Sequence, residues 1–106
     1  MTLSTHPAVQ HCETMTEVRA HIDALDARIV PLLAERSGYV AQAARIKQHA
    51  DQVHDQARID FIVDRVRAMA RAQGAPEAVV EATYRAMIDA FITFEHARFQ
   101  QLRQGA

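Results

Sequence analysis

The sequence predicts an all-α protein of one domain, and three observations lead to this prediction. The chain has 106 residues, of which 49% are hydrophobic, so it can form one folded core but is too short for two. Only three Gly and three Pro are present, whereas a β-sandwich or β-barrel needs many more turn residues. Apolar residues also recur at steps of three and four, which is the spacing of a helical face.

The first of three predicted helices extends from about Thr14 to about Gln48. Its start, Thr14-Met15-Thr16-Glu17, fits a capping box, in which the Thr hydroxyl and the Glu carboxylate each accept a hydrogen bond from a free amide. A heptad-like stripe then continues for four repeats. The stripe consists of Val18, Ile22, Leu25, Ile29, Leu32, Arg36, Tyr39, Ala43 and Ile46. Residues 1–13 are expected to form a flexible N-terminal tail, and residues 14–104 the helical domain.

Pro31 lies within this stripe and could divide the helix. A proline in a helix interior removes a hydrogen bond and clashes with the preceding turn, at a cost of about 3 kcal/mol. One interpretation is therefore a break near Val30 and two shorter helices. We favour a kinked but continuous helix, because the apolar stripe keeps its phase across Pro31 and a loop would normally disturb it.

Two further helices are predicted after a polar connection over residues 49–54. Asp55 is a typical N-cap for the second helix, which ends near Gly74, a residue suited to a left-handed helix terminus. Its apolar face comprises Ile59, Ile62, Val63, Val66 and Met69. Pro76 is expected in the first turn of the third helix, where its missing amide costs nothing. That helix should fray after Arg103.

The length of the first helix predicts a homodimer. A helix of about 35 residues is about 50 Å long, which exceeds the width of a compact domain of this size. The rest of one chain cannot cover its stripe along the full length. We therefore expect an oligomer in which the long helices of two chains run along each other.

Composition excludes several classes of function. A net charge of −1 argues against a nucleic-acid-binding protein, which usually carries a basic face. Cys12 is the only cysteine, and the six histidines show no metal-binding spacing, so no metal site is expected. Residues 1–13 do not resemble a signal peptide, and no apolar segment approaches the roughly 18 residues of a membrane span. We expect a cytoplasmic protein without nucleic-acid or membrane partners.

Charged residues occupy positions that should be apolar. Arg36 interrupts the stripe, and Lys47, the only lysine, follows 11 residues later. The two cations therefore share a helix face within about 20° and lie about 16 Å apart along the axis, so both can reach one small anion between them. Glu95 interrupts the apolar face of the third helix, and a buried charge needs a partner. Together these residues indicate a polar pocket.

A structural interpretation accounts for the same charges. Inward-facing Arg and Glu can pair with each other and fix helix register, and Arg can extend outward from an apolar face. Arg19 alone resembles a solvated helix residue, while Asp55 and Arg58 resemble an N-cap and an exposed pair. The charges by themselves leave both interpretations open.

Residues 18–47, VRAHIDALDARIVPLLAERSGYVAQAARIK, resemble the first helix of the all-helical (type II) chorismate mutase family, which includes the isochorismate pyruvate lyases. The shared features are an Arg near the start, an I-D-x-L-D run, L-L-A-E-R in the middle and a Lys 11 residues after that Arg. The segment HDQARIDFIVDRV over residues 54–66 is similar to the second helix of the family. The spacing from Pro76 to Glu95 is similar to that of the third, so the resemblance covers roughly residues 16–102.

The resemblance implies an intertwined homodimer of three-helix chains with two equivalent active sites. Arg36 and Lys47 would contact the substrate from one chain, and Arg19 would reach the site from the partner chain. The family rearranges chorismate to prephenate in one pericyclic step, on the route to phenylalanine and tyrosine, without a cofactor. Arg19 and Arg36 would then bind the two substrate carboxylates. Lys47 would donate to the breaking ether oxygen.

Residues of the second and third helices add to the implied site. Asp55 matches the acidic residue that holds the ring hydroxyl, and Arg58 matches the Arg that follows it in the family. The mutases commonly have a Glu at the position of Ile59. Loss of this Glu is a feature of the lyases. Glu95 replaces a Gln that hydrogen-bonds the ether oxygen. An ionised carboxylate would repel this oxygen, so we expect Glu95 to act protonated and activity to be higher at mildly acidic pH.

Three functions remain open at this point, and chorismate mutase is the preferred one because Asp55 is placed for the substrate hydroxyl. Isochorismate pyruvate lyase, which makes salicylate and pyruvate, is the second, and Ile59 is its main support. The third is a non-catalytic dimerisation module in which the inward charges only fix helix register. A regulatory helical module bound to a larger biosynthetic enzyme is a further alternative.

Overall fold

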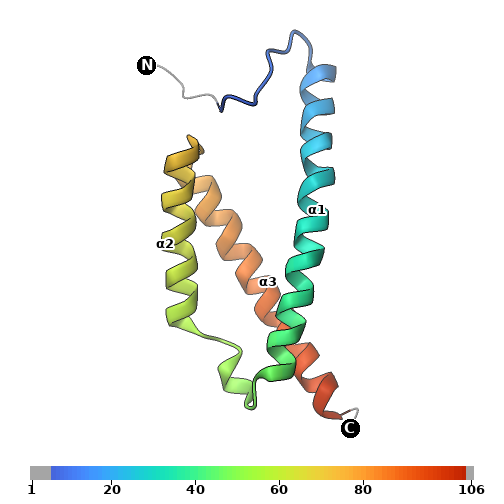
Figure 1. Ribbon diagram of the computed structural model, residues 1–106, viewed down its shortest axis with the longest axis vertical. Helices are drawn as coiled ribbons and strands as arrows, with labels where there is room; N and C mark the ends of the chain where they lie inside the picture. Colours follow the sequence, from blue (N-terminus) through green and yellow to red (C-terminus); the bar gives the residue numbers. More distant parts are fainter. Residues whose placement is uncertain (1–5, 105–106) are drawn as a thin grey trace.

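A computed structural model describes residues 6–104 of the chain and confirms the all-α prediction, with no strand in this range. Its elements are α1 (Met15–Ile46), the short 3-10 helix η1 (Ala50–Gln52), α2 (Gln56–Gln73) and α3 (Glu77–Gln104). Figure 1 shows α3 running diagonally from the end of α2 to the C-terminal end of α1, and it packs against both helices. The N-terminal half of α1 extends beyond this packing.

The beginning of α1 follows the predicted capping box only in part. Thr14 is the N-cap, and its hydroxyl accepts a hydrogen bond from the amide of Glu17 at 3.2 Å, as predicted. The Glu17 carboxylate, however, accepts from the amide of Glu13 at 3.0 Å and not from that of Thr14. Thr14 has an extended conformation, which brings the amide of Glu13 within reach of the Glu17 carboxylate. Of the predicted tail, residues 1–5 lie outside the described residues, and its flexibility stays a prediction.

Pro31 does not divide the first helix. α1 continues through it over 32 residues, so the continuous interpretation is confirmed and the break near Val30 is wrong. The kink stays a prediction. α1 ends slightly earlier than predicted, at Ile46, and Lys47 is its C-cap in an extended conformation.

The connection after α1 is more ordered than predicted. It contains η1, and the side-chain oxygen of Gln52 accepts hydrogen bonds from the amides of Gln48 at 2.9 Å and His49 at 3.1 Å. These bonds satisfy two main-chain amides that lie between α1 and η1 and belong to neither helix. The direction of the chain after α1 is therefore fixed by a side chain within the connection itself.

The boundaries of α2 and α3 follow the capping residues. Asp55 caps α2, because its Oδ1 accepts from the amide of Arg58 at 3.0 Å, and Gly74 terminates it with a left-handed φ of 71°. Such a cap stabilises a helix by about 1 kcal/mol. Pro76 precedes α3 by one residue, and its carbonyl accepts from Val80 at 3.2 Å. α3 continues one residue beyond the predicted end at Arg103.

One chain covers only part of its own apolar surface. The radius of gyration is 17.7 Å, whereas a compact chain of this length has about 13 Å. The buried apolar residues lie near the end of α1, in the connection after it, and in α2 and α3; they are Ala44, Val53, Val63, Val66, Ala70, Ile88 and Phe99. Stripe residues in the N-terminal half of α1 are exposed instead, with 50% for Ile22, Leu25 and Ile29. The expectation that this chain cannot cover the stripe is thus met.

Two further properties of residues 6–104 concern partners. None of the helices here has both the length and the apolar character needed to cross a membrane. No three His, Cys, Asp or Glu side chains in this range gather closely enough to bind a metal ion.

Candidate active site

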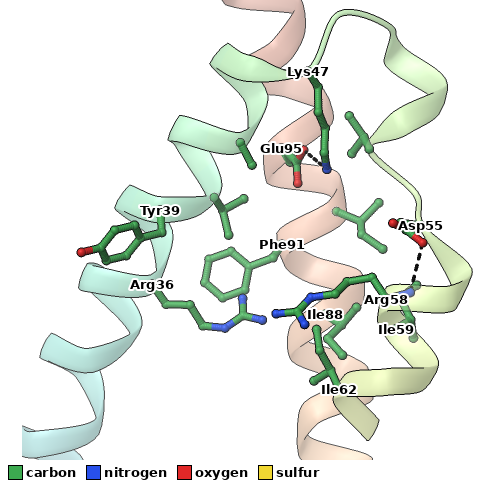
Figure 2. A pocket seen from close by; sticks show the side chains of 14 residues that line it. Arg36, Tyr39, Lys47, Asp55, Arg58, Ile59, Ile62, Ile88, Phe91 and Glu95 are labelled. Atoms are coloured by element: carbon green, nitrogen blue, oxygen red, sulfur yellow. Dashed lines mark hydrogen bonds and ion pairs between the residues drawn. The ribbon is translucent and has the colours of Figure 1, made fainter.

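A cavity of about 460 Å³ lies between the C-terminal half of α1, the beginning of α2 and the middle of α3 (Figure 2). Its volume is in the range of small-molecule sites. The residues that line it are Arg36, Tyr39, Val40, Ala43, Lys47, Val53, Asp55, Arg58, Ile59, Ile62, Ile88, Phe91, Ile92 and Glu95. Five of the six residues expected to form a site are therefore brought together, although they are spread over 60 positions of the sequence.

Arg36 faces the cavity and does not extend away from the apolar stripe. Its guanidinium carbon lies 4.7 Å from the centre of the Phe91 ring, which is a cation–π contact between α1 and α3. The side chain is half-buried. Phe91 thus holds the guanidinium at the cavity wall, where its donors can bind an anion.

Lys47 and Glu95 form an ion pair at one end of the cavity. The Nζ of Lys47 lies 2.7 Å from the Oε2 of Glu95, and the two side chains are 28% and 9% exposed. Glu95 is the one charged residue among those that the structure describes as buried. The partner of Glu95 is therefore Lys47, whereas Arg36 contacts Phe91.

Arg58 and Asp55 complete the polar lining from the start of α2. Figure 2 shows the guanidinium groups of Arg36 and Arg58 pointing toward one another across the cavity. Two like charges in this arrangement repel each other unless an anion lies between them. Asp55 lines the cavity while its Oδ1 caps α2, so helix formation itself fixes the position of this carboxylate.

Only part of the apolar lining of the cavity was predicted from the sequence. Ile59 and Ile62 belong to the predicted apolar face of the second helix, but helical spacing alone did not identify Val53, Ile88 or Phe91 as parts of a binding cavity. These residues come from three segments of the chain. Helical spacing reveals which residues share a face, but the crossing of α3 between α1 and α2 determines which faces enclose a space.

Arg19 does not line this cavity. It is exposed and lies 17 positions before Arg36 on α1, a separation of about 25 Å along the helix. No side chain has that reach. Within one chain, Arg19 and the other five expected site residues therefore belong to different regions.

The lining residues suit charge stabilisation more than covalent catalysis. Arg36, Lys47 and Arg58 supply three cations, whereas the described lining contains no Ser, Thr, Cys or His to act as nucleophile or base in a hydrolytic mechanism. Guanidinium groups bind carboxylates through paired hydrogen bonds. The cavity can therefore hold a small dianion in one conformation and stabilise charge that develops on it.

Comparisons with known proteins identify the family that this chain resembles over the cavity residues. The model of the family "Chorismate mutase type II" matches residues 18–96, which include every residue that lines the cavity. A chorismate mutase from Methanocaldococcus jannaschii is 32% identical over 68 residues, which cover 63% of this chain and 69% of that protein. The chain is thus similar to a chorismate mutase, and the region that matches the family contains its cavity.

Proposed function

The chain belongs to the type II chorismate mutase family, and we propose that it converts chorismate to prephenate in the cavity between its three helices. The observation that carries this proposal is the convergence of Arg36, Lys47 and Arg58 on one space of about 460 Å³. Chorismate is a small dianion whose rearrangement is intramolecular, so it requires a site that holds two carboxylates and one conformation. Prephenate then supplies the synthesis of phenylalanine and tyrosine.

Each polar residue has a distinct role in the proposal. Arg36 binds one substrate carboxylate, with Arg58 opposite it as a further donor, and Asp55 accepts a hydrogen bond from the ring hydroxyl. Lys47 donates to the ether oxygen whose bond to carbon breaks. Negative charge grows on this oxygen in the transition state, so the Lys47 interaction strengthens there and accelerates the reaction.

Glu95 has to change its partner when the substrate binds. Before binding, its carboxylate accepts from the ammonium of Lys47 at 2.7 Å. The ether oxygen competes for that ammonium, and an ionised carboxylate beside it would repel the charge that develops. In its protonated form Glu95 becomes a donor to the same oxygen. The proposed catalytic form is therefore a protonated Glu95 together with a charged Lys47.

The proposal includes a homodimer in which the partner chain supplies Arg19. The chain exposes 8256 Å², compared with about 6,000 Å² for a compact monomer of this size. The excess of about 2,250 Å² per chain lies within the roughly 1,000–2,500 Å² that each chain of an obligate homodimer buries. Its apolar part includes Ile22, Leu25 and Ile29 on the same half of α1 as Arg19. A second α1 along this face would bring its Arg19 toward the cavity.

Isochorismate pyruvate lyase is the second candidate, because Ile59 lines the cavity. An apolar residue there offers no hydrogen bond to a substrate hydroxyl. Asp55 lines the same cavity and can bind that hydroxyl, so the mutase reaction remains the first choice.

A product assay tests the proposal directly. The purified protein is offered chorismate and isochorismate separately. We expect prephenate from chorismate at a higher kcat/KM than pyruvate from isochorismate. Faster release of salicylate and pyruvate would favour the lyase. If neither substrate reacts, and a dianionic transition-state analogue leaves the Tm unchanged, the chain is a dimerisation module and the proposal is wrong.

A further inference from the structure

Arg103, on the last turn of α3 and outside the cavity, binds the end of α1. Its Nη1 donates to the carbonyl oxygen of Ala44 at 2.9 Å, and its Nη2 donates to the carbonyl oxygen of Lys47. The guanidinium carbon lies 3.6 Å from the centre of the Phe99 ring, and Phe99 is buried. Three contacts therefore fix the position of this guanidinium.

The two carbonyl groups are ones that α1 leaves without helical partners. The last carbonyls of a helix lack amide donors within the helix. α1 ends at Ile46, and Lys47 turns out of it with φ −62° and ψ 140°. The Arg103 guanidinium spans this transition, since it binds one carbonyl in the last turn and one at the C-cap. A cation at a helix C-terminus is also favoured by the helix dipole.

α3 consequently holds Lys47 at both ends of the residue. Glu95 binds its ammonium, and Arg103 binds its main-chain carbonyl. Glu95, Phe99 and Arg103 follow each other at intervals of four residues, which places them on one face of α3. When the substrate takes the ammonium from Glu95, the contact with Arg103 is the one that remains.

We propose that Arg103 is a positioning residue for Lys47, acting through the end of α1 without contacting the substrate. This inference rests on the proposed catalytic role of Lys47. Arg103 fixes where α1 stops and the direction in which the Lys47 side chain leaves the backbone. A displaced Lys47 loses most in the transition state, where its bond to the ether oxygen is strongest. Loss of Arg103 should therefore reduce kcat and leave KM nearly unchanged.

The test compares Arg103→Ala and Arg103→Lys with a matched control, Arg98→Ala. Arg98 is an exposed arginine of the same helix whose side chain only reaches Gln101 at 3.5 Å. We expect Arg103→Ala to lower kcat by about ten- to a hundredfold, a loss typical of small misplacements of a catalytic group, with KM changed less than about threefold. Arg103→Lys should be intermediate, because an ammonium keeps the charge but not the two-pronged geometry. Arg98→Ala should match the wild type.

A second measurement follows the main chain independently of activity. Hydrogen exchange of the peptide over residues 44–53 should be faster in Arg103→Ala than in the wild type, and unchanged in Arg98→Ala. Circular dichroism verifies that each variant is folded. Where Arg103→Ala fails to fold, Arg103→Lys carries the test: a reduced kcat at unchanged KM supports the inference, and a wild-type kcat overturns it.

Lys47→Ala separates this inference from the proposed function. If Lys47→Ala keeps the wild-type rate, the catalytic role of Lys47 is wrong and the role of Arg103 with it. If Lys47→Ala is inactive while folded Arg103→Ala has the wild-type kcat, only the inference about Arg103 is overturned. A higher KM at constant kcat in Arg103→Ala would overturn it as well, because it would indicate a contribution to substrate binding.

Discussion

The ammonium of Lys47 and the carboxylate of Glu95, 48 positions apart in the sequence, lie 2.7 Å from each other at the end of a cavity lined by two arginines. The pair connects the end of α1 with the middle of α3 (Figure 2). Because Glu95 is 7% exposed, its carboxylate depends on this partner. In the proposed mechanism the same pair opens when the substrate binds, so one contact serves both the stability of the free chain and the placement of its catalytic ammonium.

The first prediction concerns the pH dependence of the reaction. A carboxyl group donates to the ether oxygen only in its protonated form, whereas an amide donates at every pH. Glu95→Gln should therefore keep the donor and have a flatter pH–rate profile than the wild type, as measured by kcat/KM of both proteins over a range of pH.

The matched control is Glu81→Gln. Glu81 is a half-buried glutamate of α3, and the pKa of its carboxyl group is lowered mainly by a hydrogen bond from Arg85. It lies outside the cavity, so its variant should keep the wild-type profile. If the pH–rate profiles of Glu95→Gln and the wild type are parallel, the protonation of Glu95 does not contribute to the reaction and this prediction is wrong.

The second prediction concerns the cations. Arg36→Ala and Lys47→Ala should each lower kcat/KM by at least about a hundredfold, which is the loss expected for a group that stabilises transition-state charge. The helical circular dichroism spectrum should persist in both. Arg45→Ala is a suitable control, because Arg45 lies in the last turn of the same helix but does not line the cavity.

The third prediction concerns stability. Lys47→Ala leaves the buried Glu95 carboxyl without its partner, and we expect a loss of about 1–3 kcal/mol in the free energy of unfolding. Lys47→Ala combined with Glu95→Gln should be more stable than Lys47→Ala alone, since no charge then remains to be buried. Urea unfolding of the three proteins measures this difference. Equal midpoints for the single and double variants would contradict it.

Much of the fold could be predicted because its signals are local. Thr14, Asp55 and Gly74 mark helix ends by their side chains or backbone freedom, and each lies where the structure places a helix boundary. The continuous α1 followed from the phase of the apolar stripe across Pro31. The partner of Glu17 and the turn η1 were missed, because both depend on where a loop amide happens to lie.

The site likewise contains residues that the sequence could predict and contacts that only the fold determines. Arg36, Lys47 and Glu95 could be identified because charges at apolar positions require an explanation. The stacking of Arg36 on Phe91 could not, since it depends on the crossing of α1 and α3. The contact of Arg103 with α1 was not predicted for a similar reason. An arginine near a helix end is common, and only the fold brings this one to the end of another helix.

The fourth prediction concerns substrate preference. Ile59→Glu introduces an acceptor for the substrate hydroxyl at the cavity wall. One additional hydrogen bond contributes about 0.5–1.5 kcal/mol, which corresponds to about a two- to tenfold change. The ratio of kcat/KM for chorismate to that for isochorismate should rise by this amount. Ile59→Leu, which stays apolar, should leave the ratio unchanged; a similar shift in both variants would assign the effect to cavity shape.

The last prediction concerns the origin of Arg19. If the partner chain supplies it, Arg19→Ala and Lys47→Ala should each form inactive homodimers. A mixed dimer of the two variants contains one site with both defects and one with neither. Unfolding and refolding an equimolar mixture produces such dimers as about half of the total, so about a quarter of the wild-type activity should return. Refolding each variant alone should restore nothing. A mixture that stays inactive, although mixed dimers form, would contradict the supply of Arg19 by the partner chain. Wild-type activity of Arg19→Ala alone would instead remove Arg19 from the site. Arg19 and Lys47 of one chain lie 28 positions apart along α1, about 42 Å, which is too far for both to bind one small substrate.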